Sequence, residues 1–196
     1  SFNLPGAGKK AGSVGRLMKK IEGRTLDPDT HEILHESKAG ILSFKGPNIF
    51  TGYLNNPEQT KEVLSDDGWF ITGDLGRMDE DGFLFIEGRL SRFSKIGGEM
   101  VSHQSVEDMI AEVLTMTGHP NEEMFCAVTG IADGAKGERL VLLSKVEVNS
   151  QWIGEKLRNK GVPNLWIPKQ IKKVNEIPVL GTGKLDLRKL KELAET

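Results

Sequence analysis

Hydrophobic and polar residues follow different patterns in the two parts of the chain. Over residues 17–46, short apolar runs alternate with polar and turn residues, which predicts short antiparallel strands in a small barrel or twisted sheet. A helix of residues 57–64 is expected next, because Pro57 suits its first position. A turn at residues 79–82 then folds the following strand, residues 83–87, into a hairpin.

After Arg89 the pattern changes to alternating helices and strands. Ser102 can cap a helix whose apolar residues share one face, namely Val106, Met109, Ile110, Val113 and Leu114. The other expected elements are strands 124–131, 139–148 and 170–177, a helix from Ser150 to Gly161, and a last helix capped by Asp186. The fold class is therefore α+β, with a domain of residues 1–88, a hinge at 89–93 and a small three-stranded domain of residues 94–196.

Composition narrows the function classes. Charged residues make up 28% of the 196 residues and the net charge is -2, which favours a globular protein over a nucleic-acid binder. Cys126 is the only cysteine and lies in an apolar run, so we expect a buried thiol and a reducing, cytoplasmic setting. No apolar stretch is long enough to cross a bilayer, and no secretory signal pattern opens the chain, so no membrane contact by this segment is expected.

The sequence also contains a partial phosphate-loop pattern and a histidine pair, and both are weak signals. Gly8-Lys9 lacks the earlier glycine and the following hydroxyl residue of a phosphate loop. His31 and His35 have a helical metal-site spacing, but their segment is predicted to be strand and turn, so no metal site is expected. The glycine- and lysine-rich opening has no periodicity, which indicates a fragment that enters in the middle of a domain.

Three glycine-flanked segments are the candidates for chemistry. Asp74 ends a Thr-Gly-Asp turn, where a carboxylate can accept two hydroxyl hydrogen bonds. Arg89 follows Gly88, and its planar guanidinium can reach the same neighbourhood. Lys95 precedes two adjacent glycines, and Lys184 ends a glycine-rich turn. Each feature alone is typical of an ordinary surface turn.

Together, the runs WFITGD, GRLSRFSKIGG and PVLGTGK resemble, in order, the signatures of the adenylate-forming acyl-CoA synthetase superfamily. The resemblance implies that residues 1–88 are the last, barrel-like part of the large AMP-binding domain and that residues 94–196 are the mobile C-terminal domain. The phosphate loop and acyl pocket of those enzymes have no counterpart here, so the fragment alone is expected to be inactive.

The resemblance also implies residue roles. Lys184 would be the catalytic lysine of adenylate formation, where two anions meet and a cation is needed. Nucleotide or acceptor contacts would come from Thr72, Asp74, Arg89, Lys95, Gly97 and Gly98. Ser91 and Arg92 would form the hinge, about which the small domain swings between two half-reactions. The implied cofactors are ATP and Mg²⁺, the latter bound mainly by the missing N-terminal part.

A narrower resemblance, carried by GEMVS, GVPNLWIPKQI and PVLGTGKLD, is to the acyl carrier protein synthetase part of bacterial bifunctional 2-acylglycerophosphoethanolamine acyltransferases. It implies a fatty acid and acyl carrier protein as partners, a fused lysophospholipid acyltransferase, and association of the whole protein with the cytoplasmic side of a bacterial inner membrane. The alternatives are an acyl-CoA synthetase that uses free coenzyme A and a non-catalytic carrier-protein docking module.

Candidate docking cations are Lys156, Arg158, Lys160, Lys169, Lys172 and Lys173. Ser91, Met100 and Ser105 depart from the usual residues of the superfamily.

Overall fold

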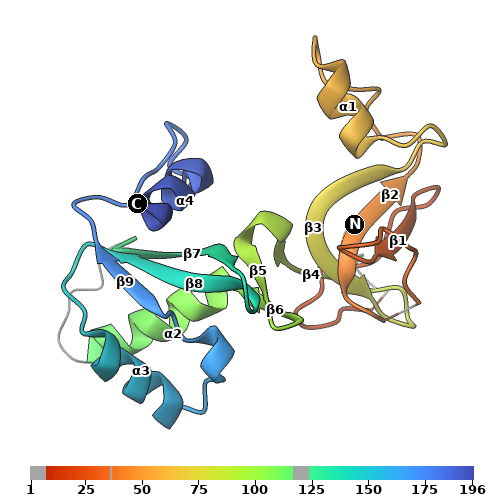
Figure 1. Ribbon diagram of the computed structural model, residues 1–196. Coiled ribbons are helices and arrows are strands. Elements are labelled where there is room, and N and C mark those ends of the chain that lie inside the picture. The colour runs from red at the N-terminus through yellow and green to blue at the C-terminus, as the bar shows by residue number, and fades with distance from the viewer. Residues whose placement is uncertain (1–7, 36, 117–123) are drawn as a thin grey trace. The chain divides into compact units, whose positions relative to one another are not determined.

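The computed structural model describes residues 8–35, 37–116 and 124–196 (Figure 1). The first residues of the glycine- and lysine-rich opening lie outside these ranges. The chain divides into two compact units, Ser1–Leu90 and Ser91–Thr196, which are named unit 1 and unit 2 here. This division falls close to the domain boundary that the change of pattern after Arg89 predicts.

Unit 1 is built on a four-stranded antiparallel sheet of order β1-β2-β3-β4. Its strands are β1 (Glu22–Leu26), β2 (Gly40–Lys45), β3 (Phe70–Met78) and β4 (Leu84–Arg89). No closed barrel forms among the described residues, so the twisted-sheet alternative holds, and Figure 1 shows β3 strongly curved. Helix α1 (Pro57–Val63) begins with proline as expected, and the Asn56 side chain accepts a hydrogen bond from the Gln59 amide.

Among its described residues, unit 2 contains a five-stranded sheet, not the three strands expected. Its order is β6-β5-β8-β7, and β9 pairs in parallel with β8. The strands are β5 (Phe93–Ile96), β6 (Glu99–Ser102), β7 (Cys126–Asp133), β8 (Gly137–Ser144) and β9 (Gln170–Lys173). The two extra strands form a hairpin around Gly97 and Gly98, whose φ angles of 59° and 88° allow a tight turn. The prediction was wrong because four-residue strands beside two glycines have the composition of a loop.

The described part of unit 2 also contains three α-helices: α2 (His103–Met116), α3 (Ser150–Asn159) and α4 (Leu187–Glu195). The caps expected at Ser102 and Asp186 are confirmed, because their side chains accept hydrogen bonds from the Ser105 and Lys189 amides. Asn149, not Ser150, caps α3 by accepting from the Trp152 amide at 2.9 Å. Adjacent Asn and Ser are both good caps, so the sequence did not distinguish them.

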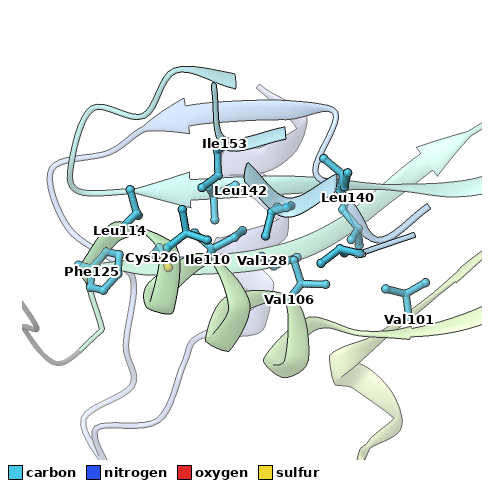
Figure 2. Close-up of a cluster of buried hydrophobic side chains, with 14 of the residues drawn as sticks. Val101, Val106, Ile110, Leu114, Phe125, Cys126, Val128, Leu140, Leu142 and Ile153 are labelled. Atoms are coloured by element: carbon cyan, nitrogen blue, oxygen red, sulfur yellow. The ribbon is translucent and has the colours of Figure 1, made fainter. Parts of the chain in front are cut away.

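The core of unit 2 lies on both faces of its sheet. Figure 2 shows α2 packed through Val106, Ile110 and Leu114 against side chains that include Val128 and Leu142. The alternate residues Ala127 and Leu143 form a second cluster with Leu190 of α4. Because both faces are buried, β7 and β8 have nearly continuous apolar runs in the sequence. Cys126 is a free thiol buried in this core, and burial raises its pKa to about 12.

Candidate nucleotide and acceptor sites

The Thr-Gly-Asp segment of unit 1 lies at an irregularity in the pairing of β3 with β2. The register shifts between Ile41 and Ser43 of β2, and Gly73 adopts a positive φ of 72°. The Thr72 hydroxyl donates to the Leu42 carbonyl at 2.8 Å and accepts from the Asp74 amide at 3.0 Å. These two bonds hold the irregular segment and fix the backbone that presents the Asp74 carboxylate.

Arg89 lies directly opposite Asp74 on the neighbouring strand β4. Its Nε is 2.9 Å from the Asp74 Oδ1 atom, and its Nη1 donates to the Thr72 carbonyl at 3.1 Å. The Arg89 and Asp74 side chains remain 65% and 29% exposed. Thr72, Asp74 and Arg89 therefore form one cluster, named the TDR cluster here, in which an accessible carboxylate is oriented by a guanidinium. Such a cluster can accept hydrogen bonds from ligand hydroxyls and attract a nearby anion.

An apolar pocket of about 290 Å³ adjoins the TDR cluster within unit 1. Asp74 is the one charged residue among its described lining residues, which include Leu42, Phe44, Phe70 and Ile86. Ligand sites commonly combine an apolar wall with a few polar groups that fix orientation. Asp74 supplies such a polar group at this wall.

The predicted acceptor residues Lys95, Gly97 and Gly98 lie together on the β5–β6 hairpin of unit 2. The Gly97 amide donates to the Lys136 carbonyl at 2.9 Å, and the Lys95 amide donates to the Glu138 carboxylate at 2.8 Å. The turn is therefore held by the β7–β8 connection. The two glycines thus form a supported tight turn.

Lys184 lies on a different turn of unit 2, just before α4. The backbone of this turn is closed by hydrogen bonds from the Leu180 amide to the Lys184 carbonyl at 2.7 Å and from the Gly183 amide to the Leu180 carbonyl at 2.8 Å. The Lys184 side chain is exposed. A fixed backbone thus presents an accessible ammonium group, as a residue that contacts an anionic ligand requires.

The predicted hinge residues Ser91 and Arg92 belong to a single 3-10 turn, Leu90–Arg92. The boundary between the two units falls after Leu90, within the segment 89–93. Arg92 is not exposed: its guanidinium contacts the Glu107 carboxylate at 2.5 Å and the Val128 carbonyl at 3.2 Å. Whether this segment acts as a hinge stays a prediction.

Several of the candidate docking cations already have partners. Lys172 donates to the Leu193 carbonyl near the end of α4, at 3.3 Å. Lys160 contacts Glu112 at 2.6 Å and Lys173 contacts Glu147 at 3.8 Å. Exposed pairs of this kind cost little to open, but Lys172 is half-buried and also caps a helix end. Lys169 and Lys173 are therefore more accessible to a partner than Lys172.

Sequence reasoning missed a buried polar network on α2. His103 Nε2 is 2.9 Å from the Ser94 hydroxyl, and Glu107 contacts Arg92. Burial, and then the charge of Arg92, lowers the pKa of His103 to about 3, while burial raises the pKa of Glu107 against the opposing effect of Arg92. Both residues lie on the same helical face as Val106 and Ile110, and two polar residues within an apolar stripe are the signal that could have revealed them.

Two further properties concern metals and membranes. The described residues contain no group of three or more His, Cys, Asp or Glu side chains that could hold a metal ion. None of the helices in the described part of the chain is long and apolar enough to span a bilayer.

No protein-family model matches the chain. The chain is 31% identical over 195 residues to luciferin 4-monooxygenase of Photuris pensylvanica, a match that covers 97% of this chain and 34% of that enzyme. It is also 31% identical over 196 residues to a probable 4-coumarate–CoA ligase of Dictyostelium discoideum, covering 98% of this chain and 34% of the relative. The chain thus spans about a third of the length of these curated relatives.

The chain is also similar to solved structures over most of its length. ATP-bound MatB from Rhodopseudomonas palustris matches with a TM-score of 0.70 and 30% identity over 93% of this chain and 35% of MatB. The α+β fold matches the C-terminal portion of adenylate-forming enzymes. The relatives and structural neighbours support the adenylate-forming superfamily that the three motifs indicate.

Proposed function

We propose that this chain is part of an adenylate-forming acid–thiol ligase, to which it contributes nucleotide-binding residues and the adenylation lysine. The observation that carries this proposal is the TDR cluster, an accessible carboxylate held at 2.9 Å by Arg89 beside an apolar pocket. The similarity to a CoA ligase and to an ATP-bound enzyme supports ATP as the activating substrate.

The proposed reaction has two steps. A carboxylate oxygen of the acid attacks the α-phosphorus of ATP, the bond from that phosphorus to the oxygen bridging the β-phosphorus breaks, and pyrophosphate leaves. The acceptor thiol then loses its proton, its sulfur attacks the acyl carbonyl carbon, and AMP leaves with the oxygen that came from the acid. The first step brings two anions together, so a cation must stabilise the developing charge.

Each candidate residue has a role in this scheme. Asp74 accepts hydrogen bonds from the ribose hydroxyls, and Arg89 holds the carboxylate in place. Lys184 provides the cation of the first step, and the hairpin with Lys95, Gly97 and Gly98 contributes to thioester formation. In the complete protein, Mg²⁺ would be bound mainly by the N-terminal part of the enzyme, as the family resemblance implies.

The finer proposal is a fatty acid as substrate and acyl carrier protein as acceptor, in a protein fused to a lysophospholipid acyltransferase at the cytoplasmic side of a bacterial inner membrane. It is supported by the resemblance of GEMVS, GVPNLWIPKQI and PVLGTGKLD. Exposed Lys169 and Lys173 would attract an acidic carrier protein. If so, Lys169→Glu with Lys173→Glu raises the KM for carrier protein at low salt and leaves adenylate formation unchanged.

Free coenzyme A is the second candidate acceptor, because a relative of 31% identity is a probable 4-coumarate–CoA ligase. Thioester formation measured in parallel with holo-carrier protein and with coenzyme A distinguishes the two. A protein that binds carrier protein but forms no acyl-adenylate would instead be a docking module.

Replacement of Asp74 tests whether the TDR cluster contributes to ATP binding. In the complete protein, Asp74→Asn keeps the shape but removes the charge, so the KM for ATP should rise at least about tenfold, equivalent to about 1.4 kcal/mol. Asp81→Asn is the matched control, because Asp81 is an exposed acidic residue of the same unit with an ion pair to Lys10 at 3.3 Å. An unchanged KM for ATP in Asp74→Asn would contradict the assignment.

A further inference from the structure

Strand β7 is the last strand of the unit 2 sheet, and one of its edges has no neighbouring strand among the described residues. It pairs with β8 along its whole length, from Cys126 to Asp133. The backbone groups on the opposite edge still need hydrogen-bond partners, because several of these residues are buried away from water. Val128 is fully buried.

At Val128 two side chains take the place of a neighbouring strand. The Glu107 carboxylate accepts from the Val128 amide at 2.6 Å, and the Arg92 guanidinium donates to the Val128 carbonyl at 3.2 Å. Arg92 and Glu107 also contact each other at 2.5 Å. A carboxylate and a guanidinium thus present one acceptor and one donor to the strand edge, as the backbone of a neighbouring strand would.

The three residues form a closed arrangement that we name the Arg92–Glu107–Val128 clamp. The Arg92 and Glu107 side chains are only 14% and 10% exposed. Opening the clamp would leave a buried charge and buried backbone groups without partners, which is more costly than opening an exposed ion pair. Arg92 is therefore held firmly to both β7 and α2.

Arg92 is also the last residue of the turn Leu90–Arg92, where the two units divide. Its side chain is fixed to unit 2, whereas neighbouring Ser91 is exposed. Backbone rotation at the boundary is thus easier before Arg92 than after it.

We infer that Glu107 is a positioning residue: acting through Arg92, it anchors the end of the inter-unit connection to the edge of β7 and so confines the pivot to the backbone before Arg92. This inference rests on the proposed two-step reaction, because the position of a pivot matters only if the protein alternates between two arrangements of its units in the two half-reactions. Loss of the anchor should therefore change the balance between the half-reactions more than the affinity for ATP.

The test uses Glu107→Gln in the complete protein. Glutamine keeps the shape of the side chain but loses the charge that holds Arg92, so both the contact with Arg92 and the charge-assisted hydrogen bond from the Val128 amide should weaken. Adenylate formation and thioester formation from supplied acyl-adenylate are measured separately. We expect the ratio of the two rates to change at least about fivefold, with an unchanged KM for ATP. Arg92→Lys, which keeps the charge but loses the two-pronged contact, serves if Glu107→Gln does not fold and should shift the ratio in the same direction.

Glu112→Gln is the matched control, because Glu112 lies on the same helix and pairs with Lys160 at 2.6 Å but is 53% exposed. It should leave the ratio unchanged. Hydrogen exchange of the peptides that contain Arg92 and Val128 provides a readout independent of activity, and we expect faster exchange in Glu107→Gln only.

The outcomes separate the two proposals. If the wild-type protein performs both half-reactions, an unchanged ratio in Glu107→Gln and Arg92→Lys, or an equal loss of both rates, overturns the anchor alone. If the wild-type protein performs neither, the proposed function fails and the catalytic role of the anchor fails with it. Unchanged exchange at Val128 in Glu107→Gln overturns the clamp whatever the activity.

Discussion

The two units differ in how completely they bury their apolar side chains. Unit 2 packs α2 and α4 against its sheet, and Ile110, Leu142 and Leu157 are fully buried. In unit 1, α1 has no buried residue, and Leu54 is 91% exposed. The TDR cluster lies in unit 1. The comparison indicates that unit 2 has the more extensive buried core, while unit 1 leaves more of its large apolar side chains exposed.

The largest expected effect is a direct contrast of two leucines. Leu157→Ala removes a buried side chain of α3 and should lower the free energy of unfolding by about 2–5 kcal/mol, because it leaves a cavity. Leu54→Ala should change it by less than about 0.5 kcal/mol. Chemical denaturation of each variant measures both values, and equal losses would remove the distinction between the units.

The buried His103 of unit 2 predicts a pH dependence. Burial and Arg92 lower its pKa to about 3, so above the unfolded-state pKa of about 6.5 the folded protein has its full stability. As the pH falls below 6.5, the unfolded chain binds a proton that the folded protein does not, and stability falls by about 1.4 kcal/mol per pH unit, or about 2 kcal/mol at pH 5. The slope should flatten in His103→Gln and persist in His35→Gln, which replaces an exposed histidine. An unchanged slope in His103→Gln would refute this origin.

A smaller effect is expected at the β5–β6 turn. Gly97 has a φ of 59°, so Gly97→Ala should cost about 1 kcal/mol of stability through backbone strain. Gly134→Ala is the control, because a methyl group there meets open space at a φ outside the positive range. Thermal denaturation compares the two, and equal melting temperatures would show that the turn adapts without strain.

Within unit 2, sequence patterns predicted the helices better than the short strands, for a physical reason. The helical stripe that includes Ile110 and Leu114 is buried, so its period of 3.6 residues shows directly in the sequence. The β5–β6 hairpin was missed because its strands are short and its turn is made by glycines. Strands β8 and β9 end at Ser144 and Lys173, earlier than expected, because apolar residues continue beyond the last paired position.

The candidate site was predictable only in part. The motifs identified Thr72, Asp74 and Arg89, and the strand register explains why they meet: Asp74 and Arg89 are direct partners. The clamp of Arg92 and Glu107 depends on a contact across 15 residues and on a strand edge that no local pattern reveals. The partner of Lys172 likewise comes from a helix end distant in sequence.

The measurement that tests the account most directly is the effect of Lys184→Ala on each half-reaction of the complete protein. Lys184 lies exposed on a closed turn of unit 2 and is proposed to act only while the charge at the α-phosphate develops. We predict that adenylate formation falls about 10²–10³-fold, by analogy with other groups that stabilise a charged transition state. Thioester formation from supplied acyl-adenylate should stay within about threefold of wild type, because Lys184 is proposed to act only in the first step. An equal effect on both rates would mark a role in both steps. Lys189→Ala, an exposed lysine of α4, should leave both rates unchanged. An equal loss of both half-reactions in Lys184→Ala, or full adenylate formation without this lysine, would contradict the account.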